Sequence, residues 1–130
     1  MKRINIDELK KVIDNSEAFE DVVTKKVYDH YNNISYLDLM CIDEVSGDYK
    51  TFASIYEDGL LAMMFGAVNV FEVMENTEEY HDPETGNILS EYDNYETIVD
   101  IIVYTVKQDI EDGRYFLDDI LICIKSYEAE

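Results

Sequence analysis

The chain has little of several residues that usually shape or divide a protein. Its 130 residues include one proline, two histidines, two cysteines, five scattered glycines and no tryptophan. Without a proline- or glycine-rich linker, and at the usual length of one domain, we expect residues 1–130 to form a single domain. The longest apolar run, 60–68, is far shorter than the ~20 residues of a membrane span. No apolar signal region follows the N-terminus, so we expect a cytoplasmic protein without a membrane partner.

The scarcity of histidine and cysteine argues against the common kinds of catalytic and metal site. Cys41 and Cys123 lie among apolar neighbours, so we expect two buried free thiols rather than a disulfide. His30 and His81 do not complete a zinc-ligand spacing with them, and we expect both to be ordinary exposed or half-exposed histidines rather than catalytic bases. The glycines match neither a phosphate-binding loop nor a calcium loop. We therefore expect a protein that is not an enzyme and that uses no cofactor or metal.

The charge is the most unusual property of the sequence. Thirty Asp and Glu residues face ten Lys and Arg residues, which gives a formal net charge of −20. Small soluble domains usually carry a net charge of magnitude ~2–8, and a larger excess destabilises the folded state by self-repulsion. Because nucleic acids are bound mainly by Lys and Arg, this chain would be repelled by them. We expect a basic protein as the partner, with no direct binding of nucleic acid.

The charge is also unevenly distributed. Residues 1–26 contain six acidic and six basic residues, whereas residues 51–106 contain twelve acidic residues and no Lys or Arg. This asymmetry predicts a molecule with one strongly acidic side. A folded body with one unusually solvated face would give the same pattern, so that alternative stays open.

The hydrophobic pattern predicts an α+β fold. Helical spacing over 6–31 indicates one broken helix or two short ones, with Asp7 or Ser16 as caps. Alternating aromatic and β-branched residues over 36–43 and 49–56 indicate a β-hairpin.

The remaining segments complete this expectation. The mostly apolar stretch 59–71 predicts a central buried helix, and 82–87 has the residues of a turn. The stretch 97–106 is ambiguous, but its β-branched residues favour a strand, and 115–125 is a further strand candidate. The whole is an antiparallel sheet with an N-terminal helix or helices and one central buried helix, the helices lying on one side.

The acidic residues of the base-free region are spaced in a way that could imitate the phosphates of DNA. If residues 69–82 are helical, carboxylates three or four residues apart lie ~5–6 Å apart at Cβ. On a strand, carboxylates two residues apart lie ~6.5–7 Å apart. Interleaved tyrosines, Tyr80, Tyr92 and Tyr95, could add cation–π contacts to Arg and Lys. The predicted partner-binding residues are Glu72, Glu75, Glu78, Glu79, Asp82, Glu84, Glu91, Asp93 and Glu96.

In size, charge, composition and the carboxylate-rich stretch from Glu72 to Asp100, the chain resembles the acidic DNA-mimic inhibitors: anti-CRISPR and anti-restriction proteins of phages and mobile elements. The resemblance is one of character and includes no motif. It implies stoichiometric inhibition of a defence nuclease in the host cytoplasm through the nuclease's basic DNA-binding surface.

Two other classes remain open at this point. An immunity protein or antitoxin that neutralises a nuclease toxin has a similar character, and so does a non-enzymatic cytoplasmic interaction module. A homodimer formed through an edge strand is a further possibility.

Overall fold

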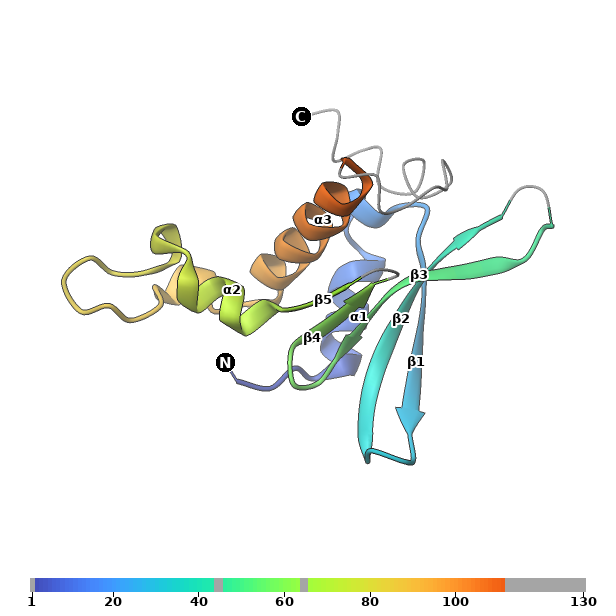
Figure 1. Ribbon diagram of the computed structural model, residues 1–130, viewed down its shortest axis with the longest axis horizontal. Helices are drawn as coiled ribbons and strands as arrows, with labels where there is room; N and C mark the ends of the chain where they lie inside the picture. The colour runs from blue at the N-terminus through green and yellow to red at the C-terminus, as the bar shows by residue number, and fades with distance from the viewer. Residues whose placement is uncertain (1, 44–45, 64–65, 112–130) are drawn as a thin grey trace.

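The computed structural model describes residues 2–43, 46–63 and 66–111. They form an antiparallel sheet with the strand order β1-β2-β3-β4-β5, together with helices α1, α2 and α3 (Figure 1). This confirms the α+β class, the antiparallel sheet and the N-terminal helix. The elements are α1 (Ile6–Asp14), η1 (Glu17–Phe19), β1 (Val23–Asp29), β2 (Ile34–Ile42), β3 (Tyr49–Tyr56), β4 (Leu60–Met63), β5 (Gly66–Asn69), α2 (Val70–Asn76), η2 (Glu78–Tyr80), η3 (Ser90–Tyr92) and α3 (Tyr95–Glu111).

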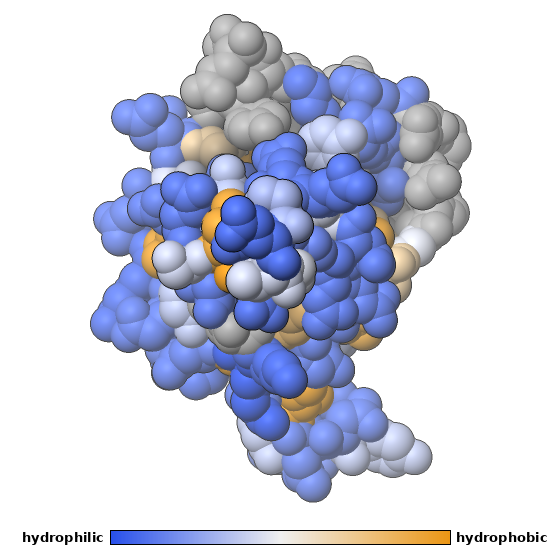
Figure 2. All heavy atoms as spheres, turned by 90° about the vertical axis from the view of Figure 1, so that its left-hand side faces the viewer, coloured by the Kyte–Doolittle hydropathy of each residue, from blue (hydrophilic) through white to orange (hydrophobic). Residues whose placement is uncertain are grey.

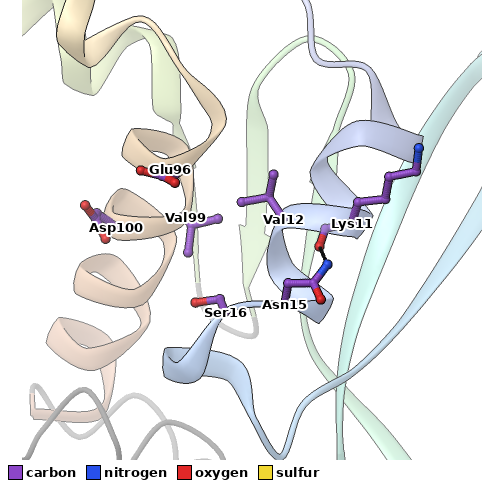
Figure 3. Close-up of a pocket in the computed structure, with 7 residues that line it drawn as sticks. All are labelled: Lys11, Val12, Asn15, Ser16, Glu96, Val99 and Asp100. Carbon is purple, nitrogen blue, oxygen red and sulfur yellow. Dashed lines mark hydrogen bonds between the residues drawn. The ribbon is translucent and has the colours of Figure 1, made fainter.

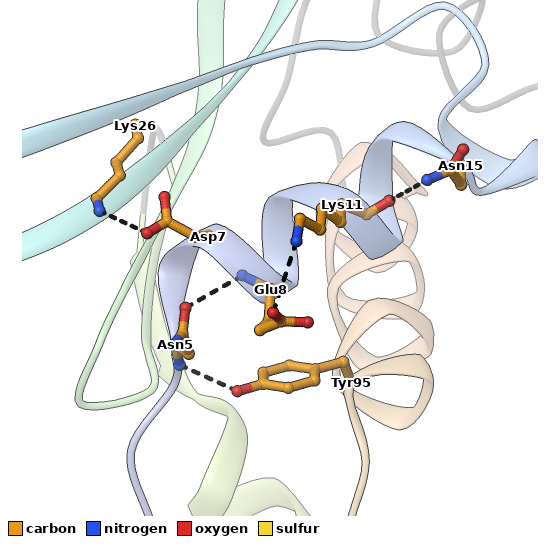
Figure 4. A network of polar contacts seen from close by, with 7 residues as sticks. All are labelled: Asn5, Asp7, Glu8, Lys11, Asn15, Lys26 and Tyr95. Atoms are coloured by element: carbon orange, nitrogen blue, oxygen red, sulfur yellow. Dashed lines mark hydrogen bonds and ion pairs between the residues drawn. The ribbon is translucent and has the colours of Figure 1, made fainter.

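The N-terminal helix α1 begins at a cap that the sequence did not single out. The Asn5 side chain accepts a hydrogen bond from the backbone N–H of Glu8, so Asn5, rather than Asp7, is the N-cap. The Asn5 backbone N–H donates to the Tyr95 hydroxyl at 3.1 Å, which joins the start of α1 to the start of α3 (Figure 4). Ile6, Leu9 and Ile13 then form the buried stripe of the helix.

The expectation of helix throughout 6–31 is wrong for its second half, because residues 23–29 form β1. Val23, Thr24, Val27 and Tyr28 are β-branched or aromatic, and the whole segment pairs with β2 from Val23↔Met40 to Asp29↔Ile34. The helical spacing of its apolar residues was therefore a weaker guide than their strand propensity.

The predicted hairpin is confirmed as β2 and β3, which pair in antiparallel register. A register shift between Leu39 and Met40 marks a β-bulge, with Ala53 opposite Leu39 and Thr51 opposite Met40. Phe52 lies between these two pairs and has no cross-strand partner of its own in β2, and it is buried together with Ala53.

The sheet has two unlike faces. The inner face is turned toward α1: Lys26 forms an ion pair with Asp7 of that helix at 3.0 Å (Figure 4), and Thr24 donates to Asp14 at 2.6 Å. Leu37 is the cross-strand neighbour of Lys26 and is fully buried. The opposite face, here called the outer face, consists of the alternate residues of β1–β5 that include the cross-strand row Val27, Tyr36 and Tyr56.

The prediction of a buried helix over 59–71 is wrong. Gly59, with φ +91°, follows the turn after β3, and the segment continues as β4, β5 and only then α2. Asn69 ends β5 and caps α2, because its side chain accepts from the backbone N–H groups of Phe71 and Glu72. A short, nearly continuous apolar run does not by itself distinguish a buried helix from strands.

The preference for a strand over 97–106 is also wrong, because these residues belong to α3. The Asn94 side chain accepts a hydrogen bond from the Thr97 backbone N–H at 2.9 Å at the start of this helix. Ile98, Ile102 and Val106, four residues apart, are fully buried. α3 contacts α1 and α2, and burial between these elements outweighs the modest helix penalty of β-branched residues. α3 buries one face in the core and leaves Glu96, Asp100 and Tyr104 exposed on another.

Two smaller expectations have clear outcomes. The turn over 82–87 is confirmed by hydrogen bonds from Asp82 N to Asn87 O and from Gly86 N to Asp82 O. Cys41 is disulfide-bonded, so the expectation of a free thiol is wrong for this residue. Cys123 and the strand candidate 115–125 lie outside the described residues.

No helix in the described part of the chain is both long and apolar enough to cross a membrane.

Replacing Gly59 by alanine is expected to destabilise the protein by about 1–3 kcal/mol. Its φ of +91° disfavours any side chain, and a Cβ there would lie 2.5 Å from the Phe71 ring. Gly86 has a similar φ of +74° but open space around the Cβ position. Chemical unfolding should therefore show a larger loss for Gly59→Ala than for Gly86→Ala. Equal losses would mean that the Phe71 ring moves aside without cost.

Candidate functional site: an acidic, tyrosine-lined cleft

The base-free region folds around a cleft of about 760 Å³ between α2, η2, η3 and α3. In Figure 1 this part of the chain projects from the sheet on the side away from β1. We call it the acidic cleft, and its lining residues are Val73, Thr77, Glu79, Tyr80, Glu91, Tyr92, Asn94, Glu96, Thr97, Asp100, Ile101 and Tyr104.

Local hydrogen bonds hold two walls of the acidic cleft together. The Thr77 hydroxyl donates to the Val73 carbonyl at 2.7 Å, where α2 ends. The Leu89 N–H donates to the Tyr80 carbonyl at 2.8 Å, which brings the start of η3 back to the end of η2. As a result, the rings of Tyr80 and Tyr92 pack together with centroids 5.0 Å apart and planes inclined by 60°.

The charge of the cleft is entirely negative. Glu79, Glu91, Glu96 and Asp100 line it, and the lining includes no Lys, Arg or His. In the described part of the chain, the side chains of Glu79, Glu91 and Glu96 form no hydrogen bond or ion pair, and the same holds for Glu72, Glu75, Glu78 and Glu84. These carboxylates are not neutralised by neighbours, so their field extends into solvent.

The basic residues of the described chain are concentrated elsewhere. Arg3 pairs with Glu57 at 2.8 Å, Lys10 with Asp14 at 2.8 Å, and Lys11 with Glu8 at 3.7 Å (Figure 4). The basic member of each pair lies in the N-terminal segment or α1, whereas Glu57 follows β3. The lining of the acidic cleft includes none of these basic residues, although Lys11 lines a neighbouring hollow together with Glu96 and Asp100.

The structure brings together only some of the nine predicted binding residues. All are exposed except the half-buried Asp82, and three of them, Glu79, Glu91 and Glu96, meet in the acidic cleft. The others, Glu72, Glu75, Glu78, Asp82, Glu84 and Asp93, lie on the same elements or their connections but do not line the cleft. The face of the molecule that carries α2 and this segment is predominantly hydrophilic (Figure 2).

A continuous line of carboxylates on one helix over 69–82 does not form. α2 ends at Asn76, and Thr77 has extended backbone angles, φ −109° and ψ 113°, before η2 begins. The spacing of three and four residues therefore does not place Glu72, Glu75 and Glu79 on one helical face. The acidic surface is assembled from several short elements instead.

Sequence reasoning missed Asp100 and Tyr104, because it favoured a strand over 97–106. In the helix α3, Glu96, Asp100 and Tyr104 follow one another at four-residue spacing and so share one face of the helix. This four-residue spacing is visible in the sequence and would have grouped the three residues if the segment had been predicted as a helix. Of the three tyrosines expected at the site, Tyr80 and Tyr92 line the cleft, whereas Tyr95 contacts Asn5.

A second hollow of about 500 Å³ lies between α1 and α3. Figure 3 shows the two helices facing each other, with Val12 and Val99 between them. Glu96 and Asp100 line this hollow as well as the acidic cleft. Lys11 of α1 lines this second hollow with them, so here the carboxylates of α3 have a basic residue nearby.

The described residues contain no group of three or more His, Cys, Asp or Glu side chains placed to hold a metal ion. Outside the cleft, Asp29 at the end of β1 accepts hydrogen bonds chiefly from the Asn32 side chain, which lowers the pKa of this carboxyl. The described residues form an α+β protein with a five-stranded antiparallel meander and an acidic cleft beside it.

Comparison with protein-family models, curated proteins and solved structures finds no match for this chain.

Proposed function

We propose that this protein is an acidic inhibitor that binds the basic nucleic-acid-binding surface of a defence nuclease, in the manner of a DNA mimic. The observation that carries the proposal is the acidic cleft: four carboxylates and three tyrosine rings around one hollow, in a stretch of 56 residues, 51–106, without a Lys or Arg.

The chemistry of the cleft suits arginine and lysine side chains. A guanidinium can donate charge-assisted hydrogen bonds to the carboxylates of Glu79 and Glu91 while its plane stacks on the ring of Tyr80 or Tyr92. The seven glutamates named above have no side-chain partner among the described residues, so they need not break an ion pair with any of these before they meet such groups. A field of one sign also raises the rate at which an oppositely charged protein associates.

The exposed carboxylates outside the cleft extend the negative surface. Glu72 and Glu75 on α2, Glu78 on η2 and Glu84 in the following turn are all exposed. A basic groove that normally follows a DNA backbone would contact such an extended surface and not only the cleft. An inhibitor of this kind competes with DNA for its target.

The test is capture of partners by the tagged full-length chain, with and without an excess of duplex DNA. We expect a basic nuclease to be captured, to be displaced by DNA, and to be released as the salt concentration is raised, since exposed charges are screened by salt. A partner that DNA does not displace would instead support the immunity-protein or interaction-module classes. Failure to retain any basic protein above the level of an unrelated acidic bait would overturn the proposal.

A further inference from the structure

The outer face of the sheet is rich in apolar residues, and none of its described residues is fully buried. On the inner face, Leu37, Leu39, Ile55 and Leu61 are fully buried. On the outer face, every described residue is half-buried or exposed. A sheet face that only meets water is normally polar. The outer row of β2 instead reads Ile34, Tyr36, Asp38, Met40, Ile42, with one polar residue among five.

The neighbouring strands extend this apolar surface. Tyr56 of β3 packs on Tyr36 with ring centroids 4.7 Å apart, and partial burial raises the pKa of Tyr36. Ile42 and its cross-strand partner Tyr49 are 47% and 56% exposed. Val23 and Leu60, also on this face, are among the exposed large apolar residues of the chain. Contiguous apolar surface of this kind marks an interaction site.

We propose that the outer face is the contact surface of a homodimer, in which two copies of this chain pack sheet against sheet. The described strands give this face an area of roughly 500 Å², from a spacing of ~4.8 Å between strands and a rise of ~3.3 Å per residue, with β4 and β5 only four residues long. That is on the order of the ~800 Å² per partner of a standard interface.

Charge favours a second copy as the occupant. Although the chain carries −20, the charged residues among the described part of the outer face are Lys25, Asp29 and Asp38, so two copies meet there with little repulsion. Lys25 is exposed and forms no ion pair with a described residue, and it lies opposite Asp38 in the β1–β2 register. A two-fold axis between the faces can bring Lys25 of each copy to the carboxylates of the other.

This dimer is independent of the proposed inhibition and responds to salt in the opposite sense. Its contact is apolar, while the remaining surfaces of the two copies repel each other, so salt screening strengthens association. Binding of a basic partner to the acidic cleft is weakened by the same salt. Failure of one proposal therefore leaves the other in place.

The experiment is light scattering or sedimentation equilibrium on the full chain over a range of concentrations, at low and at high salt. We expect twice the monomer mass of 15.2 kDa at high concentration, with a larger dimer fraction at high salt. Ile42→Glu and, separately, Tyr49→Glu place acidic groups at the contact and should weaken association at least about tenfold. Their solvent exposure, 47% and 56%, allows both variants to fold.

The matched control is Tyr104→Glu, which adds the same charge at a 59% exposed tyrosine of α3, away from the sheet. It should leave the dimer unchanged. A monomer under all conditions would overturn the proposal, and would be the result if the chain's own residues 112–130 or another protein covered this face. Association that falls with salt, or that Tyr104→Glu disrupts as strongly as Ile42→Glu, would overturn it too.

Discussion

Reversing Glu79 and Glu91 to lysine is expected to weaken binding of the captured basic partner at least about tenfold, or ~1.4 kcal/mol. Both carboxylates line the acidic cleft, and neither has a described intramolecular partner to disturb. Each reversal replaces an attraction to the partner's Arg or Lys by a repulsion at the same place. Titration of the purified partner with each variant at fixed salt measures the effect.

The matched control for this prediction is the double reversal of Glu20 and Asp48, two exposed acidic residues outside the cleft. Both double variants raise the formal charge from −20 by the same four units, so a difference between them reports position and not total charge. Thermal unfolding should show no loss of stability in the cleft variant, since it relieves self-repulsion. Equal weakening by both variants would show that only net charge matters and would remove the cleft as the site.

Shortening Ile102 to alanine is expected to cost about 2–5 kcal/mol of the free energy of unfolding, a large share of the ~5–15 kcal/mol that stabilises a typical domain. Ile102 is fully buried on α3, the helix that packs against both α1 and α2. The substitution leaves a cavity while raising intrinsic helix propensity, so packing and propensity act in opposite directions. Chemical denaturation with circular dichroism provides the measurement.

Tyr104→Ala is the control on the same helix, where a side chain 59% exposed is removed. We expect its effect on stability to stay within about 0.5 kcal/mol. If Ile102→Ala lowered the free energy of unfolding no more than Tyr104→Ala, α3 would be stabilised by intrinsic helix propensity and not by burial. That result would contradict the packing argument.

Much of the fold and part of the site were predictable from local patterns. Alternation over β2 and β3 identified the hairpin, and the stripe of Ile6, Leu9 and Ile13 identified α1, because each element buries one face with its own period. The errors fell where local signals conflict. Over 97–106, β-branched residues favoured a strand. The nearly continuous apolar run 59–71 showed neither the 3.6-residue periodicity of a helix nor the two-residue alternation of a strand.

The candidate site, like the fold, could be predicted from the sequence only in part. The acidic, base-free character of 51–106 is a property of the sequence, and three of the residues predicted from it, Glu79, Glu91 and Glu96, line the same cleft. Asp100 and Tyr104 could not be added without knowing that α3 is a helix, since only a helix places residues four apart on one face.

The sequence by itself determined the net charge of −20, its concentration away from the N-terminal segment, and the α+β class, since these depend on composition and local periodicity. Tertiary structure alone decided that 97–106 is a helix, because the burial of Ile98, Ile102 and Val106 against other elements outweighs a preference of at most ~1 kcal/mol per residue. It also decided which carboxylates share a cleft, because the return of η3 to η2 joins residues that no local rule brings together.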